Sequence, residues 1–155
     1  MIYLTIALIA LTLFAFRELL LGYPPVGFQA AVLNRKEQAI LRASAEAFFP
    51  EGGTLPSAEQ ADVVRYVDNM LSELPFRQRF LIRLLFMFVE HGSLIFGPNR
   101  ARITRQGFEQ RIETFRHWES SSMYFRRITF LSLRTLMTLA YFGDPAVNKE
   151  LCHAA

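Results

Sequence analysis

Apolar residues recur at helical spacing along most of the chain, and no stretch alternates apolar and polar residues as a half-buried strand does. Residues 120–142 form a long apolar run, and Gly143 and Pro145 follow it as a helix stop signal. As a helix, this run would be apolar on nearly all sides, which is typical of a buried position. The pattern predicts an all-α protein, a helical bundle organised around residues 120–142.

Two helices are predicted from capping boxes. In a capping box, the side chain of the first residue accepts from the backbone amide three residues on, and the side chain of that later residue accepts from the amide of the first. Asn34 and Glu37 begin a helix that stops before Pro50, and Ser57 and Gln60 begin the next. This next helix is amphipathic. Its apolar side carries Val63, Val67, Met70, Leu71 and Leu74. Its expected solvent side carries Glu59, Asp62, Asp68, Asn69 and Ser72.

Two more helices are expected before the central run. Residues 76–91 form a strongly apolar one, which Gly92 is expected to end. Thr104 is expected to cap another helix that runs to about Trp118. A bend at the serines would then lead into residues 120–142.

A nearly uncharged apolar segment opens the chain at residues 2–16. A membrane-spanning helix needs about 20 such residues. Extension through Arg17 and Glu18 to Tyr23 supplies that length if both charges lie at the membrane interface. We expect residues 1–23 to form a membrane-anchoring helix. A cleaved signal peptide is the competing interpretation, but no basic segment precedes the run and no Ala-x-Ala site follows it.

The positions of the first basic residues predict the orientation of this anchor. They all lie on its C-terminal flank: Arg17, Arg35, Lys36 and Arg42. The positive-inside rule keeps that flank, and with it the domain, on the cytoplasmic side. The expected organisation is the anchor, a linker at 24–33, a helical domain at 34–146 and a tail at 147–155.

Charge is distributed unevenly along the 155 residues. Residues 1–75 hold five Lys/Arg against eight Asp/Glu, whereas residues 76–136 hold eleven against four. Because the basic half is also strongly apolar, it fits a membrane surface or an acidic protein partner. No nucleic-acid-binding motif accompanies the charge, so we expect no nucleic acid as partner. The single cysteine, Cys152, excludes an internal disulfide framework.

Arginines interrupt the apolar run at Arg126, Arg127 and Arg134. A buried guanidinium needs a carboxylate, carbonyl groups or a phosphate for its donors. One interpretation is a contact with another protein, which makes these arginines, together with Phe130 and Tyr141, candidate partner-interface residues. The alternative is an ion pair within the chain, with Glu90, Glu109, Glu113 and Glu119 as candidate carboxylates, or an arginine side chain that extends its charged end to solvent.

A search for catalytic chemistry gives no candidate residues. The chain has no Gly-x-Gly-x-x-Gly, no Walker lysine loop and no Gly-x-Ser-x-Gly elbow. Glu90 precedes His91, but neighbours on a helix point about 100° apart and do not form a dyad or a ligand pair on that basis. We therefore expect no catalytic residue, no cofactor-binding residue and no metal ligand in this chain.

Several short motifs resemble a known family: Leu33-Asn-Arg-Lys-Glu37, Ala47-Phe-Phe-Pro50 before a Gly-rich loop, and Val64-Arg-Tyr-Val-Asp68. They are similar to the small (third) subunit of gluconate 2-dehydrogenase. Residues 111–142, with Ser-x-x-Tyr-Phe-Arg-Arg and Leu-Arg-Thr-Leu, resemble the N-terminal helical region of membrane long-chain-alcohol oxidases. Those enzymes carry a flavin domain of the glucose–methanol–choline superfamily. The chain departs from exported members of the subunit family in having no twin-arginine signal, and it has no flavin fingerprint.

The resemblance implies a non-catalytic accessory subunit that docks a large FAD-dependent alcohol dehydrogenase or oxidase to membrane lipid. FAD would then belong to the partner chain, and lipophilic alcohols or sterols would be the substrates. The alternative is a stand-alone membrane-anchored helical scaffold, or a lipid-surface interaction protein, with no redox partner. A catalytic role ranks third, because no motif supports it.

Overall fold

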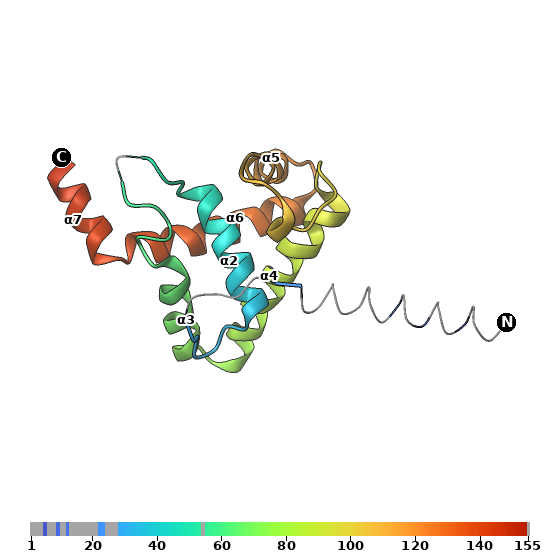
Figure 1. Ribbon diagram of the computed structural model, residues 1–155, viewed down its shortest axis with the longest axis horizontal. Helices are drawn as coiled ribbons and strands as arrows, with labels where there is room; N and C mark the ends of the chain where they lie inside the picture. The colour runs from blue at the N-terminus through green and yellow to red at the C-terminus, as the bar shows by residue number, and fades with distance from the viewer. Residues whose placement is uncertain are drawn as a thin grey trace.

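The chain is described by a computed structural model that covers residues 5, 9, 12, 22–23, 28–53 and 55–154 (Figure 1). The regular elements are α2 (Arg35–Phe48), α3 (Val63–Glu73), α4 (Phe76–Phe96), the short 3₁₀ helix η1 (Ile103–Arg105), α5 (Phe108–Glu119), α6 (Tyr124–Phe142) and α7 (Pro145–Ala154). The described part of the chain contains no strand, and the predicted all-α class is confirmed.

Helix α2 lies in the middle of the molecule and packs against α3, α4, α5 and α6 (Figure 1). Its predicted capping box is present, because Asn34 accepts from the Glu37 amide and Glu37 accepts from the Asn34 amide. Helix α6 also packs against α3, α4, α5 and α7. The bundle is therefore organised around α2 and α6 together, rather than around the 120–142 run alone.

The second capping box is also formed, but it does not begin a regular helix. The Ser57 amide donates to Gln60, and the Gln60 amide donates to the Ser57 hydroxyl. These bonds close a turn that ends at Asp62, whose positive φ of 42° interrupts the helical path. Helix α3 begins only at Val63, so the predicted start at Ser57 was wrong.

Asp68 on α3 is buried, although its polarity predicted a place on the solvent side. Its carboxylate accepts the backbone N–H groups of Ala31, Val32 and Leu33 at 2.7–3.0 Å. Burial alone would raise the pKa of Asp68, but these three bonds outweigh it and lower the pKa. Asp68, the last residue of the Val64-Arg-Tyr-Val-Asp68 motif, therefore fastens the segment before α2 to α3.

Helix α4 continues to Phe96, past the stop predicted at Gly92. A Cβ on Gly92 would lie 3.2 Å from the Trp118 ring and 3.3 Å from the Phe88 ring. The glycine is thus explained by close packing of Trp118, which is fully buried, and not by helix termination.

Helix α5 begins at Phe108, and Gln110 accepts from the Gly107 amide at its first turn. The prediction that Thr104 caps this helix was wrong. Thr104 lies in η1, where its amide and hydroxyl both donate to Glu90 instead. The C-terminal end near Trp118 is confirmed, since α5 ends at Glu119.

Helix α6 begins at Tyr124, after a bend at the serines, and ends at Phe142 before Gly143. The expectation that it is buried on nearly all sides was wrong. Leu133, Met137 and Ala140 are buried, but Tyr124, Phe125, Ile128, Leu131 and Leu139 are exposed. Residues 147–154 of the tail expected at 147–155 belong to α7, which has Pro145 in its first position.

The predicted membrane anchor, residues 1–23, lies mostly outside the described residues; Thr5, Ile9 and Thr12 are described there and are helical. Within the described residues, no helix combines the length and the apolar character needed to cross a membrane. Gly22 and Tyr23 are described, and they contact the helical domain.

Candidate functional site

Phe130 and Tyr141, two of the predicted interface residues, are buried in the core of this chain. The Tyr141 ring stacks on Phe49 with 3.9 Å between ring centroids, and its hydroxyl donates to the Pro56 carbonyl. Phe130 packs near Phe48 and Phe115. Both side chains are therefore occupied by contacts inside the domain.

The three predicted interface arginines also have partners within the chain. Arg127 donates to the carbonyls of Ser121 and Ser122 at 2.6 and 3.0 Å. Arg134 pairs with Glu119 at 3.2 Å, one of the carboxylates expected under the alternative interpretation. Arg126 lies over the Phe96 ring, 4.9 Å from its centroid. All three guanidinium groups thus have contacts within the chain, but Nε of Arg126 is buried with no hydrogen-bond partner among the described residues. Contact of the arginines with a partner stays a prediction.

Helix α4 carries a row of exposed apolar side chains. They recur at helical spacing along its whole length: Phe76, Phe80, Leu81, Leu84, Met87, Leu94 and Ile95. Phe76 and Phe80 stack on each other, with ring centroids 6.4 Å apart. A helix in a closed domain would turn such residues toward its core.

The exposed apolar row of α6 joins this row through one aromatic contact. Phe125 meets Phe88 of α4 edge to face, with ring centroids 4.5 Å apart. Leu84 is one turn from Phe88, and Ile128 is one turn from Phe125. We call these two rows together the outer apolar face. Its members on α6 are Tyr124, Phe125, Ile128, Leu131 and Leu139.

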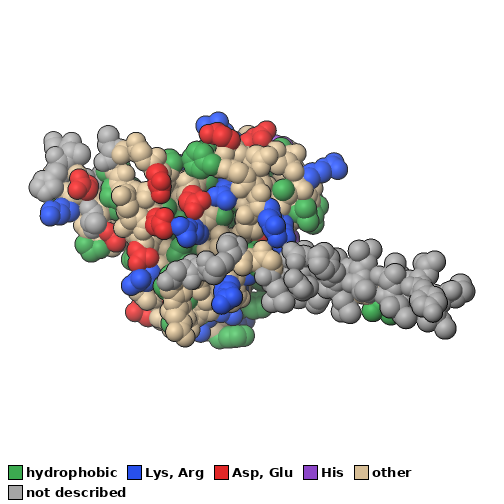
Figure 2. Space-filling view, in the orientation of Figure 1, with side chains coloured by type: hydrophobic (Ala, Val, Ile, Leu, Met, Phe, Trp, Pro, Cys, Tyr) green, Lys and Arg blue, Asp and Glu red, His purple; other side chains and the backbone are tan. Residues whose placement is uncertain are grey.

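Every charged side chain of α4 and α6 that reaches solvent is positive. Helices α4 and α6 carry six arginines: Arg77, Arg79, Arg83, Arg126, Arg127 and Arg134. Their single acidic residue, Glu90, is fully buried. The face of the molecule shown in Figure 2 carries Lys and Arg side chains interspersed with Asp and Glu side chains.

Polar side chains from three other segments of the chain surround Glu90. One carboxylate oxygen accepts from the Tyr23 hydroxyl at 3.1 Å and from the Thr104 hydroxyl at 2.6 Å. The other accepts from the Thr104 amide at 3.2 Å. The Arg102 guanidinium lies 4.0 Å away. A buried carboxylate requires such donors, so these contacts explain how an acid is tolerated inside α4.

Two cations of this group lie near the Tyr23 ring. Lys36 and Arg102 lie 5.7 and 5.6 Å from its centroid. Burial, followed by the Glu90 carboxylate, raises the pKa of Tyr23 to about 12, so its hydroxyl keeps its proton and donates. Burial and then the charge of Lys36 lower the pKa of His91, whose Nε2 lies 2.9 Å from the Lys36 ammonium. His91 is therefore the neutral acceptor for Lys36.

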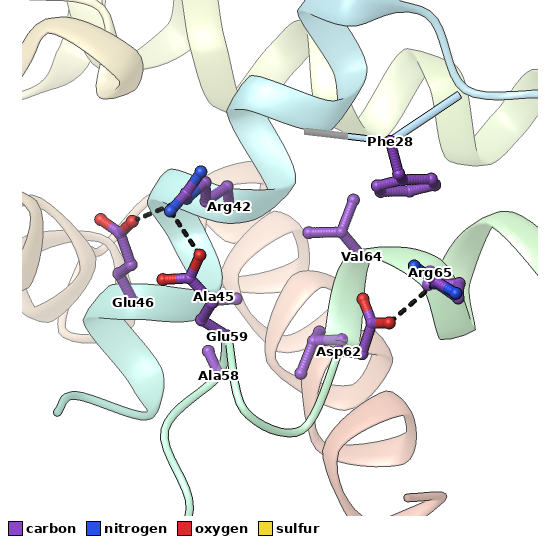
Figure 3. A pocket seen from close by; sticks show the side chains of 10 residues that line it. Phe28, Arg42, Ala45, Glu46, Ala58, Glu59, Asp62, Val64 and Arg65 are labelled. Atoms are coloured by element: carbon purple, nitrogen blue, oxygen red, sulfur yellow. Dashed lines mark hydrogen bonds and ion pairs between the residues drawn. The ribbon is translucent and has the colours of Figure 1, made fainter. Parts of the chain in front are cut away.

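A pocket between α2, α3 and the turn before α3 is shown in Figure 3. Arg42 pairs there with Glu46 and Glu59, and Arg65 pairs with Asp62 while lying over the Phe28 ring. Each of these charged side chains has a partner in the pocket wall. The pairing is typical of a solvated structural surface.

A second hollow, of about 530 Å³, lies between α2, α5 and α6. Phe48, Phe115 and Phe130 line it, and the Arg134–Glu119 pair lies at its edge. In the part of the chain that the structure describes, no group of three or more His, Cys, Asp or Glu side chains comes together to hold a metal ion.

Sequence reasoning missed the group around Tyr23. It concluded that Glu90 and His91 do not form a dyad or a ligand pair, but it did not find Tyr23, Lys36 and Arg102 as their partners. A carboxylate in the middle of an apolar helix is the one local signal for a buried polar group. Its partners come from segments up to 67 residues away, and no spacing along the chain indicates them.

Comparison with protein-family models, with curated proteins and with solved structures finds no match for this chain. The similarity to the small subunit of gluconate 2-dehydrogenase therefore remains an expectation from the short motifs. Among the features that the structure describes, the outer apolar face bears most directly on a binding function.

Proposed function

We propose that this chain is a non-catalytic accessory subunit that docks a large FAD-dependent oxidoreductase of the glucose–methanol–choline type to a membrane. The observation that carries the proposal is the outer apolar face. Soluble monomers rarely expose contiguous apolar patches of more than a few hundred Å², and larger ones mark interaction sites. Twelve large apolar side chains, spread over two helices, exceed what isolated surface residues explain.

The composition of the outer apolar face fits a stable protein interface. Interface centres are enriched in aromatic residues, Met and Arg, and are poor in acidic residues. The face carries Phe76, Phe80, Tyr124 and Phe125 as exposed aromatics, and Met87 lies among them. Arginines on both helices can also form ion pairs with an acidic surface of the partner, in addition to the apolar contacts.

The remaining parts of the proposal come from the sequence. Residues 1–23 supply the membrane anchor, and the basic flank places the domain at the cytoplasmic face. FAD belongs to the partner, and the resemblance to long-chain-alcohol oxidases favours lipophilic alcohols or sterols as substrates. The motif residues Asn34, Glu37 and Asp68 serve the fold, since they fasten the segment before α2 to α2 and α3.

A second function, a lipid-surface interaction protein or scaffold without a redox partner, is favoured by the same arginines. An apolar face that carries only exposed positive charge also suits an anionic bilayer surface. The two functions differ in one observable, because only the accessory subunit copurifies with a flavin.

The test is purification of the tagged full chain from its own cells in mild detergent. We expect a complex with FAD absorbance that bleaches when a long-chain alcohol or a sterol is added. Leu84→Gln combined with Leu131→Gln should remove the flavoprotein from the preparation while the helical circular dichroism signal stays. The control is Phe108→Gln, an exposed apolar side chain on α5. A colourless preparation from the unaltered chain would contradict the proposal and leave the lipid-surface function.

A further inference from the structure

The hollow between α2, α5 and α6 has an aromatic floor to which each of the three helices contributes one ring. These rings are Phe48 of α2, Phe115 of α5 and Phe130 of α6. Phe48 stacks on Phe115 with 5.1 Å between ring centroids, and Phe130 lies 6.0 and 6.3 Å from the two. Phe115 and Phe130 are buried and Phe48 is half-buried, so the floor is held in place by the core.

Partly exposed side chains stand around this floor. One face of α6 lines the hollow at intervals of four residues, with Phe130, Arg134, Thr138 and Phe142. The ring of Phe142 is 43% exposed, and Ile112 on α5 is half-buried. The hollow therefore keeps apolar surface that the described part of the chain does not cover.

The charged residues that line the hollow differ in their pairing. Arg134 pairs with Glu119 at 3.2 Å, and Glu119 is the one carboxylate among the lining residues. Arg116, one turn before Glu119 on α5, also lines the hollow and is exposed. Its guanidinium has no hydrogen bond or ion pair with any residue that the structure describes. One positive charge of the hollow thus lacks a counter-charge within the described residues.

The size and the lining of the hollow suit a small amphipathic ligand. Its volume of about 530 Å³ falls within the range of about 300–1,000 Å³ that is usual for small-molecule sites. Such sites are mainly apolar and aromatic, and a few polar groups orient the ligand. The pocket of Figure 3 differs on both counts, because it holds about 200 Å³ and its charged side chains are paired with one another.

We propose that this hollow binds the anion of a fatty acid, with the carboxylate on Arg116 and the alkyl chain against the aromatic floor. A guanidinium stays charged and matches the two oxygens of a carboxylate. Apolar contact with the rings removes the alkyl chain from water. The inference goes beyond the proposed function and depends on neither the flavoprotein nor the membrane.

The test is isothermal titration calorimetry of the full chain in phosphatidylcholine nanodiscs, with empty nanodiscs as the blank. Three probes share one alkyl chain and differ in the head group: octanoate, octanol and octylammonium. We expect octanoate to bind several-fold more tightly than octanol, and octylammonium to bind most weakly because Arg116 repels it. Equal affinities for octanoate and octanol would overturn the assignment of an anionic ligand.

The variant Arg116→Gln removes the proposed contact to the carboxylate. Because the side chain is exposed, the melting temperature should stay the same, while the affinity for octanoate falls several-fold and that for octanol does not change. The matched control is Arg77→Gln, which removes the same charge from an exposed position on α4, next to the exposed Phe76. An equal loss of octanoate affinity in both variants would show a response to net charge and would overturn the site.

A second variant locates the alkyl chain. Ala47 is half-buried and lines the hollow, so Ala47→Leu should fill part of it and weaken the binding of octanoate and octanol alike. Circular dichroism checks that the variant keeps its helices. An unchanged octanoate affinity in Ala47→Leu would place the ligand elsewhere and overturn the inference.

Two further results would also overturn it. If the unaltered chain gives no heat with octanoate beyond the blank, the hollow is not a fatty-acid site, while the proposed function still stands on the outer apolar face. If mass photometry of the nanodiscs shows a dimer that dissociates in Arg116→Gln, a second copy of this chain covers the hollow instead.

Discussion

The α2–α3 side and the α4–α6 side of the molecule differ in which side chains they bury and which they expose. Helices α2 and α3 bury apolar residues and also polar ones, such as Glu37 and Asp68, each with partners inside the chain. Helices α4 and α6 leave large apolar residues exposed. The polar residues of the first side have partners within the chain, whereas the second side leaves the outer apolar face exposed, and it is this face for which we propose a partner. Stability and binding are therefore separable by mutation.

The largest expected contrast concerns two leucines on one helix. Leu133 on α6 is fully buried, and Leu131, two residues earlier, is about half exposed. Leu133→Ala should lower the free energy of unfolding by about 2–5 kcal/mol through lost burial and a cavity. Leu131→Ala should change it by no more than about 0.5 kcal/mol. Urea denaturation of both variants checks this, and an equal loss would show that the outer apolar face is supported within the chain.

Asp68→Asn tests the polar side of the comparison. An asparagine has one acceptor oxygen and places an amide donor near the N–H groups of residues 31–33, so at least one of them loses its bond. We expect a loss of about 1–3 kcal/mol in the free energy of unfolding. Asp62→Asn is the control, because Asp62 is about half exposed in its pair with Arg65. A loss as large in the control would point to a general charge effect.

A low pH should lower the stability of the α2–α3 side through the carboxylate of Asp68. The pKa of Asp68 in the folded chain lies below its ordinary value of 3.8, so below that value the unfolded chain binds a proton more readily than the folded one. The stability that Asp68 contributes is present above pH 3.8 and is lost as the pH falls through the lower folded pKa. Unfolding midpoints at a series of pH values should show this fall in the natural chain and a smaller fall in Asp68→Asn.

These residues also show where the sequence was informative. Asn34 and Glu37 were predicted correctly because a capping box is a local contact over three residues. Asp68 was misplaced because its partners lie more than thirty residues away, and polarity alone favoured solvent. The exposure of α6 was missed for a related reason. An apolar helix surface predicts burial, but the sequence does not say whether the burying surface belongs to the same chain.

His91 on α4 should make a smaller, pH-dependent contribution to the stability of the folded chain. Burial and then Lys36 lower its pKa, so the unfolded chain binds the proton first as the pH falls through about 6.5. Stability should decrease from there down to the lower folded pKa and change little above it. His91→Gln, which keeps an acceptor for Lys36, should remove this slope in melting temperatures measured between pH 5 and 8. A slope that persists in the variant would assign it to another group.

The smallest expected effect is that of Arg134→Ala. Arg134 and Glu119 are each more than half exposed, and such pairs contribute about 0.2–1 kcal/mol. If the arginine serves only this pair, Arg134→Ala and Glu119→Ala should lower the melting temperature slightly and equally, and neither should change the yield of flavoprotein in the purification. If Arg134 instead meets an acidic group of the partner, Arg134→Ala alone should reduce that yield at an unchanged melting temperature. The second result would extend the partner surface from the outer apolar face to the hollow between α2, α5 and α6, which Phe48, Phe115 and Phe130 line.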